Sequence, residues 1–130
     1  MNRENKITVL VVEPERKPYT KVIDNTLRSL QREVDGYIQA IYHFEDEVAI
    51  ICDEEAKLNS KPLNRSLRDS SGEIYDIIAG TFLVVGLTED NFGALSDEQL
   101  KKYSKYFEKP ELFVRCNSKV LAIPFEYKES

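Results

Sequence analysis

The sequence is poor in the residues and motifs on which most enzymes depend. It has one histidine, His43, in 130 residues. It has no H-E-x-x-H, C-x-x-C or EF-hand pattern, which argues against a structural zinc or a calcium loop. It also has no glycine-rich phosphate loop of the G-x-x-x-x-G-K-[ST] or G-x-G-x-x-G type. A serine or cysteine nucleophile would need His43 as its base, and we expect that residue on the surface or in a hydrogen bond. The sequence therefore predicts no catalytic residue, metal site or cofactor.

Long apolar segments are missing too. No run approaches the length of a membrane span, and residues 1–6 hold no apolar core of the kind found in signal peptides. The formal net charge is -5, which disfavours nucleic acid and anionic membranes as partners, because both attract basic surfaces. We expect a protein of the reducing cytoplasm, with neither nucleic acid nor membrane as a partner.

Cysteine is scarce, and both copies lie in apolar, strand-like runs. Free cysteine is one of the most often buried residue types. Cys52 and Cys116 are therefore expected to be two small core side chains. Their spacing alone leaves a disulfide open as the alternative.

What the chain does contain is regular apolar patterning, which predicts one α+β domain over residues 1–130. We expect a curved, mostly antiparallel sheet packed with two helices. Continuous or alternating apolar runs predict the strands, and apolar residues at helical spacing predict the helices. The expected strands are 7–12, 19–23, 37–42, 48–52, one within 74–87, 112–116 and 119–123, and the expected helices are 26–34 and 96–107. The first two strands, the next two and the last two are expected to pair as neighbours.

Some segments are less regular. The pattern loosens between residues 53 and 72, which predicts a covering loop with a short helical turn over 64–68. Asp24 or Asn25 is expected to cap the first helix, and Gly36 to end it. Two acidic runs, 45–47 and 53–55, are interpreted as solvated turns, with a divalent-ion site or a phosphate-like surface as alternatives.

An aromatic residue and a polar loop suggest part of a pocket for a planar ligand. Phe82 lies two residues after Gly80, and its strand runs into the turn-prone loop 88–93, which contains Asn91. The hypothesis is that Phe82 stacks on the ligand. Core packing is the alternative role for this ring.

Three arginines extend the candidate site toward an anion. Arg65 and Arg68 are three residues apart, so they would share a face of a helical turn and could grip a phosphate. The alternative partners are the carboxylates of Asp69 or Glu73. Arg115 lies at the centre of an apolar strand pattern, so it needs either the solvent face of the sheet or an anionic partner.

Several segments resemble a small family annotated only as a domain of unknown function, found in Firmicutes genomes, their phages and conjugative elements. The similarity covers about residues 8–107. The segments that carry it are VVEP (11–14), KPY (17–19), IDNTL (23–27), VAIICDEE (48–55), PLNR (62–65), IYDIIAGTF (74–82) and VGL (85–87). The family brings no catalytic motif with it. Its setting implies an accessory role in conflict between mobile elements and their hosts.

The chain is also similar to small phage proteins that defeat Thoeris immunity by sequestering a cyclic ADP-ribose signal without cleaving it. This resemblance implies a nucleotide-derived ligand met by Phe82, Asn91 and the arginines. We therefore expect a non-enzymatic counter-defence protein of the host-cell cytoplasm. A homo-oligomer is expected, because sites of this kind often form between subunits. The alternatives are an acidic interaction protein that inhibits a host defence enzyme and a nucleotide hydrolase, against which the missing motifs count.

Overall fold

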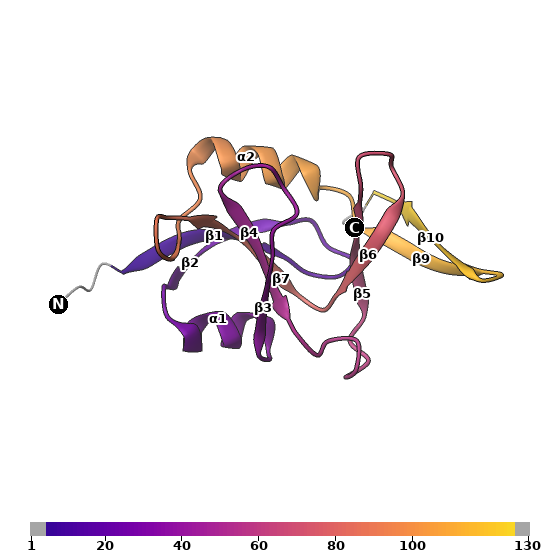
Figure 1. The fold of residues 1–130 in the computed structure, drawn as a ribbon, viewed down its shortest axis with the longest axis horizontal. Helices are drawn as coiled ribbons and strands as arrows, with labels where there is room; N and C mark the ends of the chain where they lie inside the picture. The colour runs from indigo at the N-terminus through magenta and orange to yellow at the C-terminus, as the bar shows by residue number, and fades with distance from the viewer. Residues whose placement is uncertain (1–4, 127–130) are drawn as a thin grey trace.

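A central antiparallel sheet organises the computed structural model, which describes residues 5–126 (Figure 1). Its strand order is β2-β1-β7-β4-β3, and the short β8 pairs with β7. The strands of this sheet are β1 (Lys6–Val12), β2 (Tyr19–Asp24), β3 (Ile38–Ile41), β4 (Val48–Asp53), β7 (Phe82–Leu87) and β8 (Phe92–Gly93). The predicted α+β class is confirmed, and so are the pairings of β1 with β2 and of β3 with β4.

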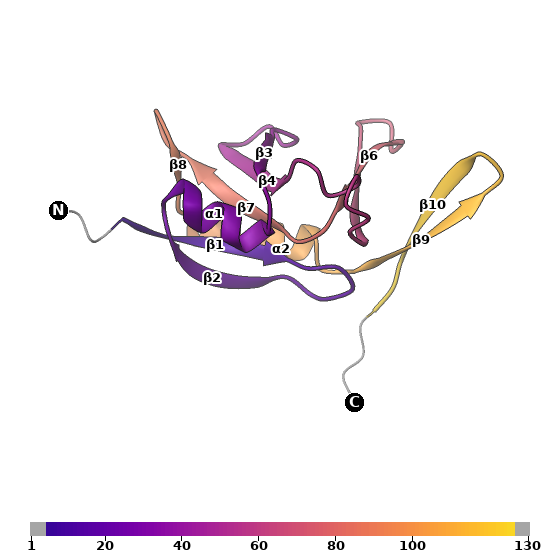
Figure 2. The same cartoon turned by 90° about the horizontal axis from the view of Figure 1, so that it is seen from below.

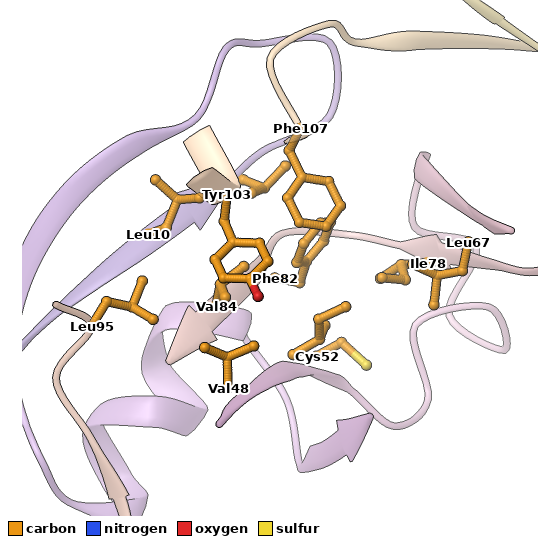
Figure 3. Packing of buried hydrophobic residues seen from close by; sticks show 12 residues of the cluster. Leu10, Val48, Cys52, Leu67, Ile78, Phe82, Val84, Leu95, Tyr103 and Phe107 are labelled. Carbon is orange, nitrogen blue, oxygen red and sulfur yellow. The ribbon is translucent and has the colours of Figure 1, made fainter. Parts of the chain in front are cut away.

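Two helices cover opposite faces of the sheet, α1 (Leu27–Val34) on one side and α2 (Asp97–Tyr106) on the other (Figure 1). Each face therefore has its own apolar core, and the central strands β1, β4 and β7 are buried on both sides. This explains why these strands are nearly continuous apolar runs rather than alternating ones. The core on the α2 side holds Phe82, Tyr103 and Phe107 in contact with aliphatic residues of the sheet (Figure 3).

The helix ends follow local capping chemistry. Ser96 forms a capping box with Gln99 at the start of α2, as expected. At α1 the cap is Thr26, whose hydroxyl accepts a hydrogen bond from Ser29. The prediction of Asp24 or Asn25 was wrong, because Asp24 ends β2 and the Asn25 amide instead donates to Phe92 O at 2.9 Å.

The carboxyl end of α1 also differs from the expectation. Asp35 rather than Gly36 adopts the left-handed conformation, with φ of 58°. Gly36 is needed for another reason: a Cβ there would lie 2.4 Å from the Asp53 carboxylate. The glycine thus provides room for a buried acid.

Two hairpins extend from the sheet. They are formed by β5 (Leu63–Arg68) with β6 (Ile74–Ala79), and by β9 (Glu111–Cys116) with β10 (Lys119–Pro124). The β9–β10 hairpin matches the prediction and projects away from the body of the molecule (Figure 2). The helical turn over 64–68 was wrong, because this segment is strand β5. Its central residues Asn64, Arg65 and Ser66 are polar but buried, so the sequence shows no apolar alternation there.

Both cysteines were expected to be buried in the core, and this is confirmed for Cys52 but wrong for Cys116. Cys52 is buried in β4, whereas Cys116 is exposed near the tip of the β9–β10 hairpin. Both are free thiols. Cys116 is exposed because no second layer covers that part of the hairpin. The expectations for residues 1–4 lie outside the described residues.

Candidate functional site

Phe82, the predicted stacking residue, lies in the centre of the core. Its side chain is completely buried between the sheet and α2, and its ring meets that of Phe107 edge-on with centroids 5.1 Å apart (Figure 3). The core alternative therefore describes its position. A ligand cannot reach this ring without opening the core.

Arg65 is also buried, with 1% of its surface exposed. Its guanidinium donates to the main-chain oxygen of Phe107 from Nε (3.2 Å) and Nη2 (2.8 Å), to Arg16 O (2.8 Å) and to Asn64 Oδ1 (2.8 Å). Burial lowers the pKa of this arginine to about 10, against an opposing effect of Glu111. Arg65 thus joins β5, the β1–β2 loop and the end of α2, and its donors are taken up by the protein itself.

The remaining predicted residues are exposed but scattered over different elements. Asn91 closes the turn between β7 and β8, where its main-chain oxygen accepts from Thr88. Arg115 lies on β9, opposite Val120. Arg68 ends β5, and one of its nitrogens donates to Gly72 O at 2.8 Å. The structure does not bring the five residues into one site, and Asp69 and Glu73 form no ion pair with either arginine.

Arg68 lies next to an exposed group of aromatic side chains that the sequence analysis did not identify. We call His43, Tyr75 and Tyr106 the aromatic patch. Tyr75 and Tyr106 are each about half exposed. His43 Nδ1 lies 2.5 Å from the Tyr75 hydroxyl, and His43 Nε2 lies 3.5 Å from that of Tyr106. Because a neutral imidazole has one donor and one acceptor nitrogen, one tyrosine accepts and the other donates.

The patch is supported from below by the aromatic core. Phe44 meets His43 at 4.8 Å and Tyr106 at 5.0 Å between ring centroids, in both cases edge to face. Phe44 also lies 6.1 Å from Phe107, which contacts Phe82. A series of ring contacts therefore runs from the buried Phe82 to the exposed patch. Phe82 can influence the patch only through this packing.

The β5–β6 pairing has a local irregularity at Tyr75. Leu67 pairs with Asp76 and Arg68 with Ile74, so Tyr75 is the extra residue between two successive pairs. Such bulges redirect a side chain out of the regular alternation of a strand. Here the result is an exposed ring on β6 that meets His43.

The electrostatics of the patch reflect both burial and neighbouring charges. Burial raises the pKa of Tyr106, and Glu111 and Tyr75 raise it further, while the positive charge of Arg68 opposes them. Burial lowers the pKa of His43, which keeps its imidazole neutral near pH 7. The patch therefore presents a neutral imidazole between two exposed tyrosine rings, with the carboxylates of Asp69 and Asp76 near Tyr75 and Arg68 near Tyr106.

A second feature lies on the other side of α2. A groove of about 630 Å³ runs between this helix and the β1–β2 hairpin, and Lys17, Lys101 and Lys105 line it. Within residues 5–126 none of the three amines lies within ion-pair distance of a carboxylate. We call this the lysine groove. It offers positive charge but no aromatic ring.

The pocket around Cys52 does not provide a reactive site. It has a volume of about 130 Å³, below the range typical of drug-sized ligands. Burial raises the pKa of the Cys52 thiol to about 11, so the nucleophilic thiolate is scarce at neutral pH. Across residues 5–126 there is also no cluster of three histidine, cysteine or carboxylate side chains suited to a metal ion.

The acidic run 53–55 contains a structural acid rather than only a solvated turn. Asp53 is buried and lies 2.7 Å from Lys61 Nζ. Burial raises the pKa of Asp53, but the contact with Lys61 and the Glu55 N–H lower it more, so the net shift is downward. Glu54 and Glu55 are exposed.

The fold and its surface define a small α+β domain with an exposed aromatic patch. The chain belongs to the family described as Domain of unknown function (DUF3846), whose model matches residues 7–108. The aromatic patch and the lysine groove lie within the matched residues, and the β9–β10 hairpin lies outside them. No curated protein and no solved structure matches the chain. None of the helices in the described part is both long and apolar enough to cross a membrane.

The sequence contains a signal for one part of the patch and none for the rest. Tyr103 and Tyr106 are three residues apart in the second helix, so they lie on neighbouring parts of one face. This spacing predicts an aromatic helix face. His43 and Tyr75 join the patch through tertiary contacts and the β5–β6 bulge. No local sequence pattern predicts either of these.

Proposed function

We propose that this protein is a non-enzymatic binding protein that captures a planar, anionic, nucleotide-derived signal, as a counter-defence factor of a phage or other mobile element. The observation that carries the proposal is the aromatic patch, in which two half-exposed tyrosine rings flank His43, with Arg68 near enough for its charge to affect the Tyr106 hydroxyl. The mobile-element role and the cyclic ADP-ribose type of signal rest on the resemblance described above. The site differs from the one expected, since it retains Arg68 and replaces Phe82 by surface rings.

The chemistry of the patch suits such a ligand. An aromatic ring that stacks on a base contributes about 1–3 kcal/mol per base and tolerates any base. Arg68 uses one nitrogen for Gly72 and keeps its remaining donors on an exposed side chain, where they can meet a phosphate. The mutual contacts of Tyr75, His43 and Tyr106 hold the rings in place before binding, which reduces the entropy cost of capture.

Calorimetric titration with cyclic ADP-ribose and ADP-ribose tests the proposal. We expect Tyr75→Ala and Tyr106→Ala each to weaken binding by about 1–3 kcal/mol, and Arg68→Ala to weaken it by about 1.5–3 kcal/mol. Arg68→Lys should restore only part of the loss, because lysine cannot make the planar bidentate contact. Tyr37→Ala is the matched control, since Tyr37 is an exposed tyrosine beside α1, the helix on the face of the sheet opposite α2.

The lysine groove provides the competing location for an anion. A Lys101→Ala, Lys105→Ala double variant should bind both probes like the unmodified protein. If this double variant loses binding while Tyr75→Ala keeps it, the ligand lies in the groove and the patch is not the site. Thermal melts of every variant identify changes caused by unfolding.

Capture without cleavage has its own test. After incubation with cyclic ADP-ribose and heat denaturation, the released nucleotide should be chemically intact by mass spectrometry. A cleavage product that accumulates with time would show a hydrolase instead. This result would overturn the non-enzymatic assignment even if the patch binds the nucleotide.

A further inference from the structure

The β9–β10 hairpin carries an unusual amount of exposed apolar surface. Residues directly opposite each other in the hairpin share a face, and on one face Leu112 pairs with Ile123 and Val114 with Leu121. All four side chains are 39–54% exposed. A lone two-stranded hairpin is marginally stable in water, so a bare apolar face of this kind calls for a partner.

The outer edge of β10 is also open. Phe125 N donates to Pro110 O at 2.9 Å, and hydrogen-bonded pairs alternate along an antiparallel ladder. Lys119, Leu121 and Ile123 therefore direct their main-chain groups toward β9, whereas Val120 and Ala122 direct theirs outward. Within residues 5–126, β10 pairs with β9 alone.

There is room for a strand at this edge. A groove of about 610 Å³ runs along β10 and is lined on one side by residues 119–123. Its other wall is formed by Arg68 and the turn from Gly72 to Ile74. Figure 2 shows the β9–β10 hairpin diverging from the β5–β6 hairpin.

Other edges of the molecule are protected in ways that β10 is not. The edge strand β2 carries Lys21 and Asp24, which are engaged by Glu33 and Lys6. Charges on an edge strand discourage pairing with another chain. The opposite edge strand, β3, has only four residues. In β10 the single charge is Lys119, at its very beginning.

We propose that two copies of this chain pair through β10, antiparallel and about a two-fold axis at Leu121. In this register Val120 exchanges main-chain hydrogen bonds with Ala122 of the second copy, and Lys119 faces the apolar Ile123 of the second copy. No like charges are opposed within the strand, and Pro124 lies opposite Ser118 in the hairpin turn of the second copy, where its missing N–H removes one main-chain hydrogen bond. The two hairpins then form one four-stranded sheet whose apolar faces are continuous.

The size of this contact predicts a reversible dimer. A strand of six residues spans about 20 Å, and the resulting interface is smaller than the roughly 800 Å² per partner of a standard stable complex. Dimerisation should therefore depend on concentration. The three aromatic residues of the patch do not line the groove along β10, whereas Arg68 does.

Sedimentation velocity over a dilution series from about 1 mM to about 1 μM tests the interface. We expect the mass of the unmodified protein to rise from one chain to two with concentration. Leu121→Lys should weaken the dimer at least tenfold, because it places two cations directly opposite each other. Ala122→Pro should do the same by removing an outward N–H, in a position where an edge strand tolerates proline.

Leu112→Lys is the matched control, because Leu112 lies on the same apolar face but on β9, away from the proposed seam. Its dimer should weaken less than threefold. A single-chain mass at about 1 mM, or dimers that survive both β10 variants, would overturn the proposal. If Leu112→Lys and Leu121→Lys weaken the dimer equally, the hairpins pack face to face. That result would also overturn pairing through the β10 edge. Circular dichroism of each variant shows whether the fold is retained.

Discussion

At the scale of single residues, burial decides which of the chemically suggestive side chains can meet a ligand. Arg65 and Arg68 look alike in the sequence, three residues apart and surrounded by polar residues. The fold separates them: Arg65 is 1% exposed and saturated by main-chain oxygens, whereas Arg68 is on the surface. Sequence patterns identify the chemistry of a residue but not its depth, which depends on contacts distant along the chain.

The role of Arg65 leads to a prediction about stability. Arg65→Ala removes the donors for Phe107 O, Arg16 O and Asn64 Oδ1, and a buried acceptor left without a partner costs about 1–3 kcal/mol. We expect a loss of at least about 3 kcal/mol in the free energy of unfolding, measured by urea denaturation. Arg68→Ala, the exposed counterpart, should stay within about 0.5 kcal/mol of the unmodified protein. Similar values for the two variants would contradict the buried role of Arg65.

Asp53 gives a prediction with a definite pH dependence. Its pKa is lowered in the folded protein despite burial, because Lys61 and the Glu55 N–H stabilise the carboxylate. A lowered folded-state pKa contributes stability above the ordinary pKa of an aspartate, near 4, and that stability is lost as pH falls through the folded value. Asp53→Asn should cost about 3–5 kcal/mol at pH 7, since it leaves Lys61 without its buried partner.

Urea denaturation between pH 7 and pH 2.5 measures this effect. The unmodified protein should lose stability in the acid range, and Asp53→Asn should show a flatter profile there. Asp35→Asn is the control, because the Asp35 side chain is 94% exposed and lies 3.8 Å from the same lysine. Parallel profiles for the unmodified protein and Asp53→Asn would rule out the proposed linkage.

At the scale of secondary-structure elements, the sequence predicts well where one period dominates. The strands β1, β4 and β7 are continuous apolar runs, and α2 has a serine cap with glutamine three residues later, so these elements were expected. Strand β5 was missed because Asn64, Arg65 and Ser66 are polar residues buried in succession, so its sequence shows no apolar alternation. A separate register shift, with its extra residue on β6, lies at Tyr75.

The capping box of α2 can be tested directly. Ser96→Ala removes the hydroxyl that accepts from Gln99 N at 3.1 Å. We expect a loss of about 1 kcal/mol in the free energy of unfolding, the usual effect of losing such a cap. Thermal and urea denaturation measure it, with Ser70→Ala in an exposed turn as the control. A loss no larger than that of the control would mean that the cap contributes nothing to stability.

At the scale of the whole molecule, the negative net charge limits where an anionic ligand can bind. The chain carries a net charge of -5, so an anionic ligand must be captured where the field is locally reversed. Arg68 near Tyr106 and the three lysines of the groove are the cations available for such capture. A helix covers each face of the central sheet (Figure 1).

Stacking of a nucleotide on the aromatic patch can be detected directly by NMR. With cyclic ADP-ribose as the probe, we expect intermolecular nuclear Overhauser effects between the adenine protons and the ring protons of Tyr75 or Tyr106. Tyr75→Phe and Tyr106→Phe should keep these effects, because the rings remain. Effects from the adenine to side chains of the lysine groove alone, or none at all at ligand saturation, would contradict the claim.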